Sequence, residues 1–111
     1  MVHVEAVALL RLISESSRHR LLHTLRSGEK SVGQLVALLQ DEQSNLSHHL
    51  ALLRQAGLVA SRRQGRNQLY RLADPEVARL LDQVEQVATR LDQVAYTSGL
   101  GMPAETVFRG Y

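Results

Sequence analysis

The segment from Gln43 to Leu72 concentrates the side chains with the clearest chemistry, since it holds five arginines and no acidic residue. The 42 residues before it carry five basic and five acidic residues, and the 39 residues after it carry three and six. The formal net charge of +2 is therefore a charge of +5 in the middle of the chain, between a neutral and an acidic flank. Such a concentrated positive charge predicts binding to a polyanion, and nucleic acid is the first hypothesis.

The first half of this basic segment predicts a helix with two different sides. At 100° per residue, Leu46, Leu50 and Leu53 fall on one side, and small polar residues fall on the other. A small polar face suits the DNA major groove, where hydrogen-bonding side chains read the base edges. The candidate readers are Gln43, Ser44, Asn45, Ser47 and His48. For His49, nearer the apolar side, we expect a structural role or a phosphate contact.

The second half predicts a β-hairpin, because residues 58–63 and 68–72 flank the turn-forming run from Gln64 to Asn67. Arginines cluster at its tip around Gly65. This arrangement is typical of a wing that lies along the DNA backbone and places an arginine in the minor groove. The candidate phosphate contacts are Arg54, Arg62, Arg63 and Arg66. Without the wing, an ordinary solvated helix face would be the better interpretation of residues 43–55.

Helices are predicted on both sides of the basic segment from apolar periodicity and from capping residues. Ser31 and Gln34 have the spacing of a capping box, and Asp74 with Pro75 begins a last helix. That helix has an apolar face wide enough for its own domain and a second helix, which predicts a homodimer; burial in its own core is the alternative. The expected fold is mainly α with a small β-hairpin, in the order α-α-α-α-β-β-α, as one domain over residues 1–111. Its parts are dimerisation helices at 1–13 and 75–96, a helix-turn-helix at 31–57, a wing at 58–72 and an irregular tail at 97–111.

Composition excludes several classes of function. Hydrophobic residues make up 44% of the chain and aromatic residues 4%, which indicates a globular domain with an aliphatic core. The chain has no cysteine, which excludes disulfides, thiolate metal sites and cysteine nucleophiles. No catalytic constellation is apparent, so we expect no enzyme. No apolar run approaches the roughly 20 residues of a membrane span, and no signal peptide is apparent, so we expect a cytoplasmic protein without a membrane partner.

One further cluster has the spacing of a metal site. Glu15, His19 and His23 recur every four residues on the second predicted helix, which places two imidazoles on one face for Zn or Ni. His3 could join them from the first helix or from the other protomer. The favoured alternative is that these histidines are solvent-exposed and pair with nearby acids, because two histidines at this spacing are common by chance.

The runs SVGQLVALL and SNLSHHLALLRQAGLVASRRQGRNQLYRLAD resemble the winged helix-turn-helix of the ArsR/SmtB family of bacterial transcriptional repressors. The resemblance extends from Arg18 to Asp74, and its most specific parts are residues 47–50, 53–59 and 65–72. It implies a homodimer joined through the first and last helices, which binds an inverted-repeat operator and releases it when an effector binds. One departure is Glu42, where family members commonly have a serine N-cap; Asp41 could take that role.

The resemblance does not identify the effector. Family members that sense metals do so through cysteines near the third helix or through Asp/His and His/Glu pairs on the last helices. No cysteine lies between Glu29 and Leu35, and the matching positions of the last helix region are Asp74, Glu76, Val87 and Arg90. The candidates for the effector are a metal at the histidine cluster, a small organic molecule and a partner protein. A redox signal is disfavoured without cysteine, and the abundance of the protein alone could set the response without an effector. The alternative function is a winged-helix module whose arginines bind an acidic protein partner.

Overall fold

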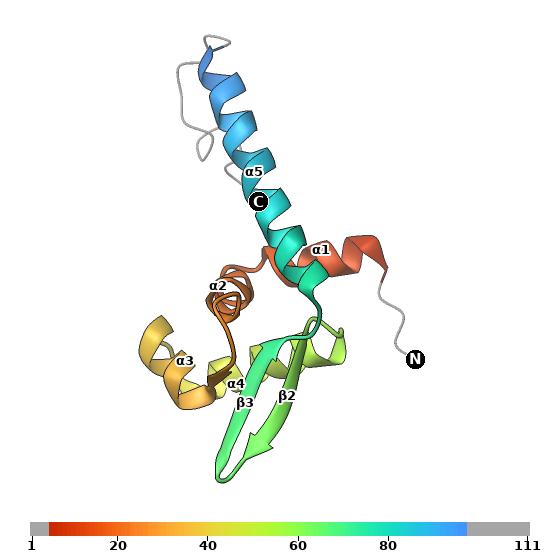
Figure 1. Cartoon of the computed structure of the whole chain (residues 1–111). Coiled ribbons are helices and arrows are strands. Elements are labelled where there is room, and N and C mark those ends of the chain that lie inside the picture. The colour runs from red at the N-terminus through yellow and green to blue at the C-terminus, as the bar shows by residue number, and fades with distance from the viewer. Residues whose placement is uncertain (1–4, 98–111) are drawn as a thin grey trace. The chain divides into compact units, whose positions relative to one another are not determined.

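The computed structural model describes residues 5–97, with side chains through residue 94. Its elements are, in order, α1 (Ala6–Ser14), α2 (Ser16–Leu25), β1 (Lys30–Ser31), α3 (Val32–Leu39), α4 (Gln43–Gln55), β2 (Val59–Gln64), β3 (Asn67–Leu72) and α5 (Pro75–Thr97) (Figure 1). The predicted mainly helical winged helix-turn-helix is confirmed, with one addition. The short strand β1 was not predicted, because two residues carry no periodicity.

The described residues fall into two compact units, one ending at Ala78 and one formed by α5 from Arg79 onward. The single domain expected over the whole chain therefore stays a prediction. Residues 1–4 and 98–111, with His3 and the expected irregular tail, lie outside the described residues. Within the described part of the chain, no helix is long and apolar enough to cross a bilayer.

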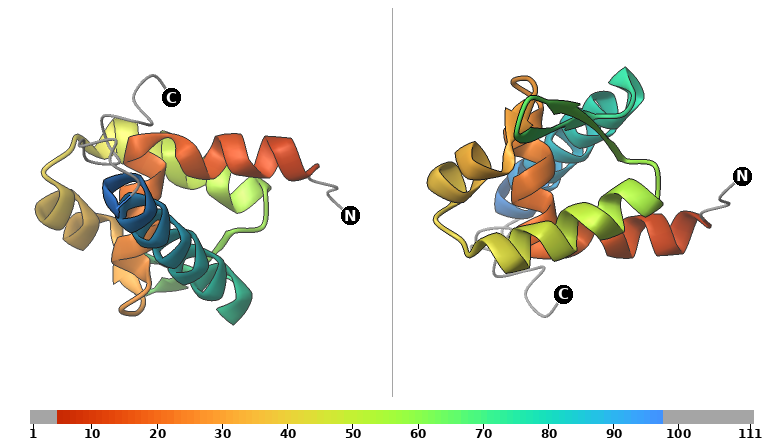
Figure 2. Two further views of the ribbon diagram at one scale, coloured as in Figure 1. Left: turned by 90° about the horizontal axis from the view of Figure 1, so that it is seen from above. Right: turned by 90° about the horizontal axis from the view of Figure 1, so that it is seen from below.

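The core of the first unit is built from leucines of three helices. α2 packs against α1, α3 and α4, and Figure 2 shows α4 crossing α2 in the view from below. The fully buried side chains of this unit are Leu21 and Leu22 of α2, Leu35 of α3, and Leu46, Leu50 and Leu53 of α4. Burying one leucine contributes about 1.5–3 kcal/mol, so three on one side of α4 determine which side faces outward.

The sheet is antiparallel, with the strand order β1-β3-β2. The hairpin has six residue pairs, from Val59 with Leu72 to Gln64 with Asn67, and its strands extend nearer to the turn than predicted. Gly65 in the two-residue turn has a φ of 61°, a left-handed conformation that such turns require. On the other edge of β3, Ser31 of β1 pairs with Leu69, so the start of α3 lies beside the middle of the wing.

The helix ends follow the predicted capping with one difference. The capping box is confirmed, since the Gln34 amide donates to Ser31 Oγ (3.1 Å) and the Ser31 amide donates to Gln34 Oε1 (2.8 Å). At α4, however, the N-cap residue is Glu42, whose side chain makes no cap bond. Asp41 instead accepts the Glu42 amide at 2.7 Å. The helix therefore begins at Gln43, which puts the first candidate reader in its first turn.

Candidate nucleic-acid interface

The outer face of α4 presents every side chain that the sequence suggested as a base reader. Gln43, Ser44, Asn45, Ser47 and His48 are all exposed, whereas the leucines of the opposite side are buried. Asn45 Nδ2 donates to Asp41 Oδ1 at 3.3 Å, which holds that amide near the start of the helix. The predicted division of α4 into an apolar and a polar side is confirmed, and base reading stays a prediction.

The arginines of the wing are not equivalent. Arg63 and Arg66 near the hairpin tip are exposed, as is Arg54 near the end of α4. Arg62 instead donates from Nε and Nη2 to the two carboxylate oxygens of Glu29, at 2.8 and 2.7 Å. This hydrogen bonding lowers the pKa of Glu29 and raises the pKa of Arg62. The Glu29 carboxylate therefore competes with a phosphate for the guanidinium group of Arg62, although that side chain is exposed.

A second polar cluster joins α4 to the corner between α1 and α2. Arg18 Nε donates to the Leu12 carbonyl oxygen at 2.7 Å, and Arg18 Nη1 lies 3.3 Å from Nδ1 of His49. Because a guanidinium group has only donors, His49 accepts this bond. Glu15 completes the cluster by accepting the Arg18 amide at 2.9 Å, which holds the pKa of Glu15 below its ordinary value. His49 thus links α4 to Arg18 of α2, which agrees with the structural one of the two roles expected for it.

The histidine cluster on α2 is smaller than the sequence suggested. His19 Nε2 and His23 Nε2 lie 3.0 Å apart, and Arg26 Nη1 lies 3.0 Å from His23 Nδ1. Glu15 does not join them, because its carboxylate caps the first turn of α2. Over residues 5–94 the structure brings no three potential ligands together, and His3 lies outside these residues. Of the proposed ligands within the described residues, the structure brings His19 and His23 together.

A hollow of about 240 Å³ separates the wing from the starts of α3 and α4. We call it the α3–wing hollow; it is lined by Ser31, Val32, Gly33, Gln43, Arg66, Asn67 and Gln68. Three of these residues belong to the start of α3, which sequence reasoning had not connected with the basic segment. The missing signal was β1, since its pairing with β3 brings the start of α3 to the wing.

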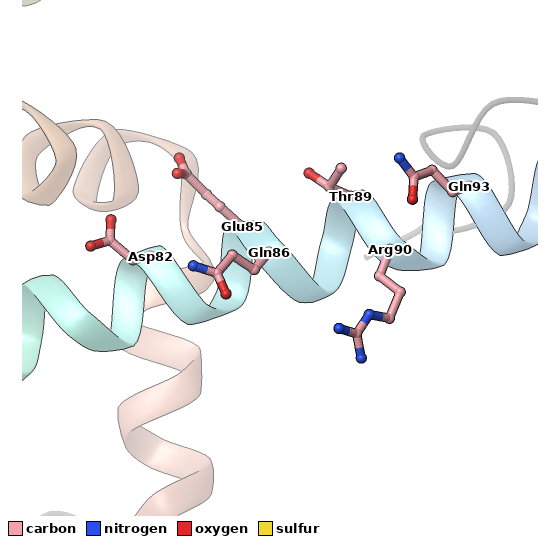
Figure 3. A pocket seen from close by; sticks show the side chains of 6 residues that line it. All are labelled: Asp82, Glu85, Gln86, Thr89, Arg90 and Gln93. Atoms are coloured by element: carbon pink, nitrogen blue, oxygen red, sulfur yellow. The ribbon is translucent and has the colours of Figure 1, made fainter.

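α5 carries two different faces. Val84, Val87 and Leu91 are 41, 44 and 42% exposed and follow one another at intervals of three and four residues. A separate polar stripe lines an open hollow along the helix (Figure 3), formed by Asp82, Glu85, Gln86, Thr89, Arg90 and Gln93. The exposed apolar stripe is the kind of surface that a second helix covers.

These features together define a winged helix-turn-helix DNA-binding protein: a supporting helix, a second helix with a polar outer face, and a basic hairpin beside it. Residues 15–61 match the model of a family described as "Bacterial regulatory protein, arsR family". The chain belongs to the arsR family of bacterial regulatory proteins. The expectation of a DNA-binding transcriptional regulator, and not an enzyme, is confirmed by this membership.

Individual relatives agree with this assignment. The chain is 42% identical over 78 residues to a biofilm growth-associated repressor of Agrobacterium fabrum, covering 70% of this chain and 67% of the relative. The crystal structure of Rv0081 of Mycobacterium tuberculosis is 36% identical, with a TM-score of 0.73, and the match covers 83% of this chain and 100% of that one. A homodimeric winged helix-turn-helix DNA-binding domain of Mycobacterium bovis, Mb0332, is 31% identical with a TM-score of 0.67, over 80% of this chain and 91% of that one.

Proposed function

We propose that the protein is a homodimeric repressor that binds an inverted-repeat operator in double-stranded DNA and acts in the cytoplasm. One observation carries the proposal: the polar face of α4 is exposed, and the arginines at the tip of the neighbouring hairpin are exposed as well. The name of the Agrobacterium relative, a repressor, supports repression. The basic segment itself contains no acid, so its positive charge attracts the phosphates of DNA.

The two parts of the interface have different roles. Gln43, Ser44, Asn45, Ser47 and His48 read base edges in the major groove. Arg54, Arg63 and Arg66 hold phosphates, which contributes affinity for any sequence. Arg62 contributes less, because DNA has to compete with the Glu29 carboxylate for it.

The proposed dimer buries the apolar stripe of α5 against a second copy of the chain, together with α1. Val84, Val87 and Leu91 have the alternating spacing of residues that pack between helices, and Val7 and Leu10 are half-exposed on α1. The homodimeric state of the related Mb0332 domain supports this assembly. Two copies related by a twofold axis match an operator whose half-sites are inverted repeats.

If the protein responds to a metal, we propose that Zn or Ni binds at the histidine pair of α2. Two imidazole nitrogens at about 2.0–2.1 Å from one tetrahedral metal lie about 3.3 Å apart, and His19 Nε2 and His23 Nε2 are 3.0 Å apart. A pair supplies two ligands, so water or another group completes the coordination. A small organic molecule or a partner protein is the alternative effector.

Fluorescence anisotropy with a palindromic promoter duplex and a scrambled duplex of equal length tests the proposal. Arg63→Ala and Arg66→Ala should weaken binding to both duplexes. Each should also reduce the slope of log affinity against log salt concentration by about one. Gln43→Ala and Ser47→Ala should instead reduce the preference for the palindrome, each by a free energy of about 1–3 kcal/mol. Unchanged duplex affinity in both wing variants would contradict the proposed interface and favour a module that binds an acidic protein.

A further inference from the structure

Gly33 in the first turn of α3 has no role in the fold itself. The glycines with a positive φ among the described residues are Gly28, Gly57 and Gly65, and Gly33 is not one of them. A Cβ atom built on Gly33 would meet only Ser31 Oγ, at an ordinary contact distance of 3.9 Å. Within a helix, glycine is less favourable than alanine. Neither backbone conformation nor packing within the described residues therefore requires a glycine at this position.

The surroundings of Gly33 suggest what does require it. Gly33 is exposed and lines the α3–wing hollow, whose other walls include Gln43 at the start of α4 and Arg66 at the wing tip. The hollow therefore brings together a candidate base reader, a candidate phosphate contact and a residue without a side chain. Its volume of about 240 Å³ is several times the roughly 30 Å³ that one water occupies in the liquid, so it admits a group of many atoms.

The geometry of a DNA duplex indicates which group of atoms would enter the α3–wing hollow. A major groove and the adjacent minor groove are separated by one sugar-phosphate strand. If α4 enters the major groove and the wing tip reaches the next minor groove, this strand has to pass between the start of α4 and the wing. The α3–wing hollow occupies that place, and Arg66 supplies a positive charge there. Glycines are favoured wherever another backbone approaches closely.

We propose that the α3–wing hollow receives the sugar-phosphate backbone of the operator strand between the two grooves, and that Gly33 lets this backbone approach α3. The proposal rests on the proposed DNA interface and extends that interface to the start of α3. A side chain at Gly33 would project from the wall of the hollow and keep the backbone away from Arg66 and α3.

Two substitutions of increasing size test this role, with a matched control. Gly33→Ala and Gly33→Leu add one and four carbon atoms to the wall of the hollow. Ala37→Leu is the control, because Ala37 is exposed, lies one turn further along the same face of α3 and does not line the hollow. Each variant is compared with the wild-type protein by thermal unfolding and by anisotropy with the palindromic duplex at one salt concentration.

The proposal predicts opposite effects of Gly33→Ala on folding and on binding. The melting temperature should stay the same or rise by up to about 5 °C, because alanine restricts the unfolded chain and favours the helix. Duplex affinity should fall by about tenfold, the loss expected for one charge-assisted contact, and further in Gly33→Leu. Ala37→Leu should bind the duplex within about twofold of the wild-type affinity, since exposed sites away from the interface contribute little.

Each contrary result has a distinct meaning. Wild-type affinity in Gly33→Leu would overturn the inference and leave the proposed function standing. A lower melting temperature in Gly33→Ala would also overturn it, because the fold would then require the glycine. A wild-type protein that binds neither the palindromic nor the scrambled duplex would overturn the proposed function and this inference together.

Discussion

Replacing Glu29 by glutamine should strengthen DNA binding, although Glu29 is outside the basic segment. The Glu29 carboxylate occupies both Nε and Nη2 of Arg62, at 2.8 and 2.7 Å. Glutamine has nearly the same size but no charge, so Arg62 becomes available to a phosphate. The substitution also removes a negative charge from the base of the wing, which would otherwise repel the DNA backbone.

The expected gain follows from counterion release. One additional phosphate contact steepens the dependence of log affinity on log salt by about 0.9, which corresponds to about eightfold tighter binding at about 0.1 M salt. The wing should keep its position without the ion pair. Its strands are held by six residue pairs between β2 and β3, whereas exposed ion pairs contribute little to stability.

A double-mutant cycle measured by anisotropy separates the two possible roles of Glu29. If Glu29 sequesters Arg62, then Arg62→Gln should reduce affinity more in the Glu29→Gln background, where Arg62 is available to a phosphate, than in the wild-type protein. The reasoning would be refuted if Glu29→Gln weakened binding or left the salt slope unchanged, because Glu29 would then be positioning the wing.

The protonation of Glu29 defines the pH range in which this experiment is informative. Hydrogen bonding from Arg62 lowers the pKa of Glu29 from its ordinary value of 4.5. A carboxyl group with a lowered folded-state pKa stabilises the fold above its ordinary pKa, and this contribution is lost as the pH falls through the lowered value. Between pH 6 and pH 8 the ion pair is therefore intact, and affinity differences between the variants should not depend on Glu29 titration.

Three further predictions concern the support of α4, the dimer and the effector. Arg18→Met keeps most of the side-chain volume but loses the hydrogen bonds to α1 and α4, so urea unfolding should show a free energy lower by about 2–4 kcal/mol; a change below about 0.5 kcal/mol would contradict the bridging role. Leu91→Glu places a charge in the exposed stripe of α5 and should convert dimers to monomers in analytical ultracentrifugation, and an unchanged dimer mass would contradict the proposed seam. Zn or Ni should alter duplex affinity in the wild-type protein but not in His19→Ala or His23→Ala, and an equal response in these variants would exclude the histidine pair.

Local patterns predicted much of the fold, because each depends on neighbours a few residues apart. Leu46, Leu50 and Leu53 repeat at helical spacing, and the structure buries all three. Ser31 and Gln34 satisfy free amides within one helical turn, so their spacing alone identifies the start of α3.

Features that depend on distant parts of the chain were not predictable in this way. The pairing of Glu29 with Arg62 joins residues 33 positions apart, and Arg18 meets His49 across 31 positions. β1 forms because its two residues pair with the free edge of β3, and two residues are too few to show the alternation of a strand. The α3–wing hollow depends on that same pairing. The sequence alone therefore did not indicate that Gly33 lies close enough to the wing to contact DNA.

The most direct test of the central claim is a hydroxyl-radical footprint of the wild-type protein on a palindromic promoter duplex. A dimer that binds an inverted-repeat operator should protect two half-sites about one helical turn apart, 10–10.5 base pairs from centre to centre. This protection should weaken steeply as the salt concentration rises. Uniform protection without half-sites, or no protection at low salt, would contradict the assignment of α4 and the wing as an operator-binding surface.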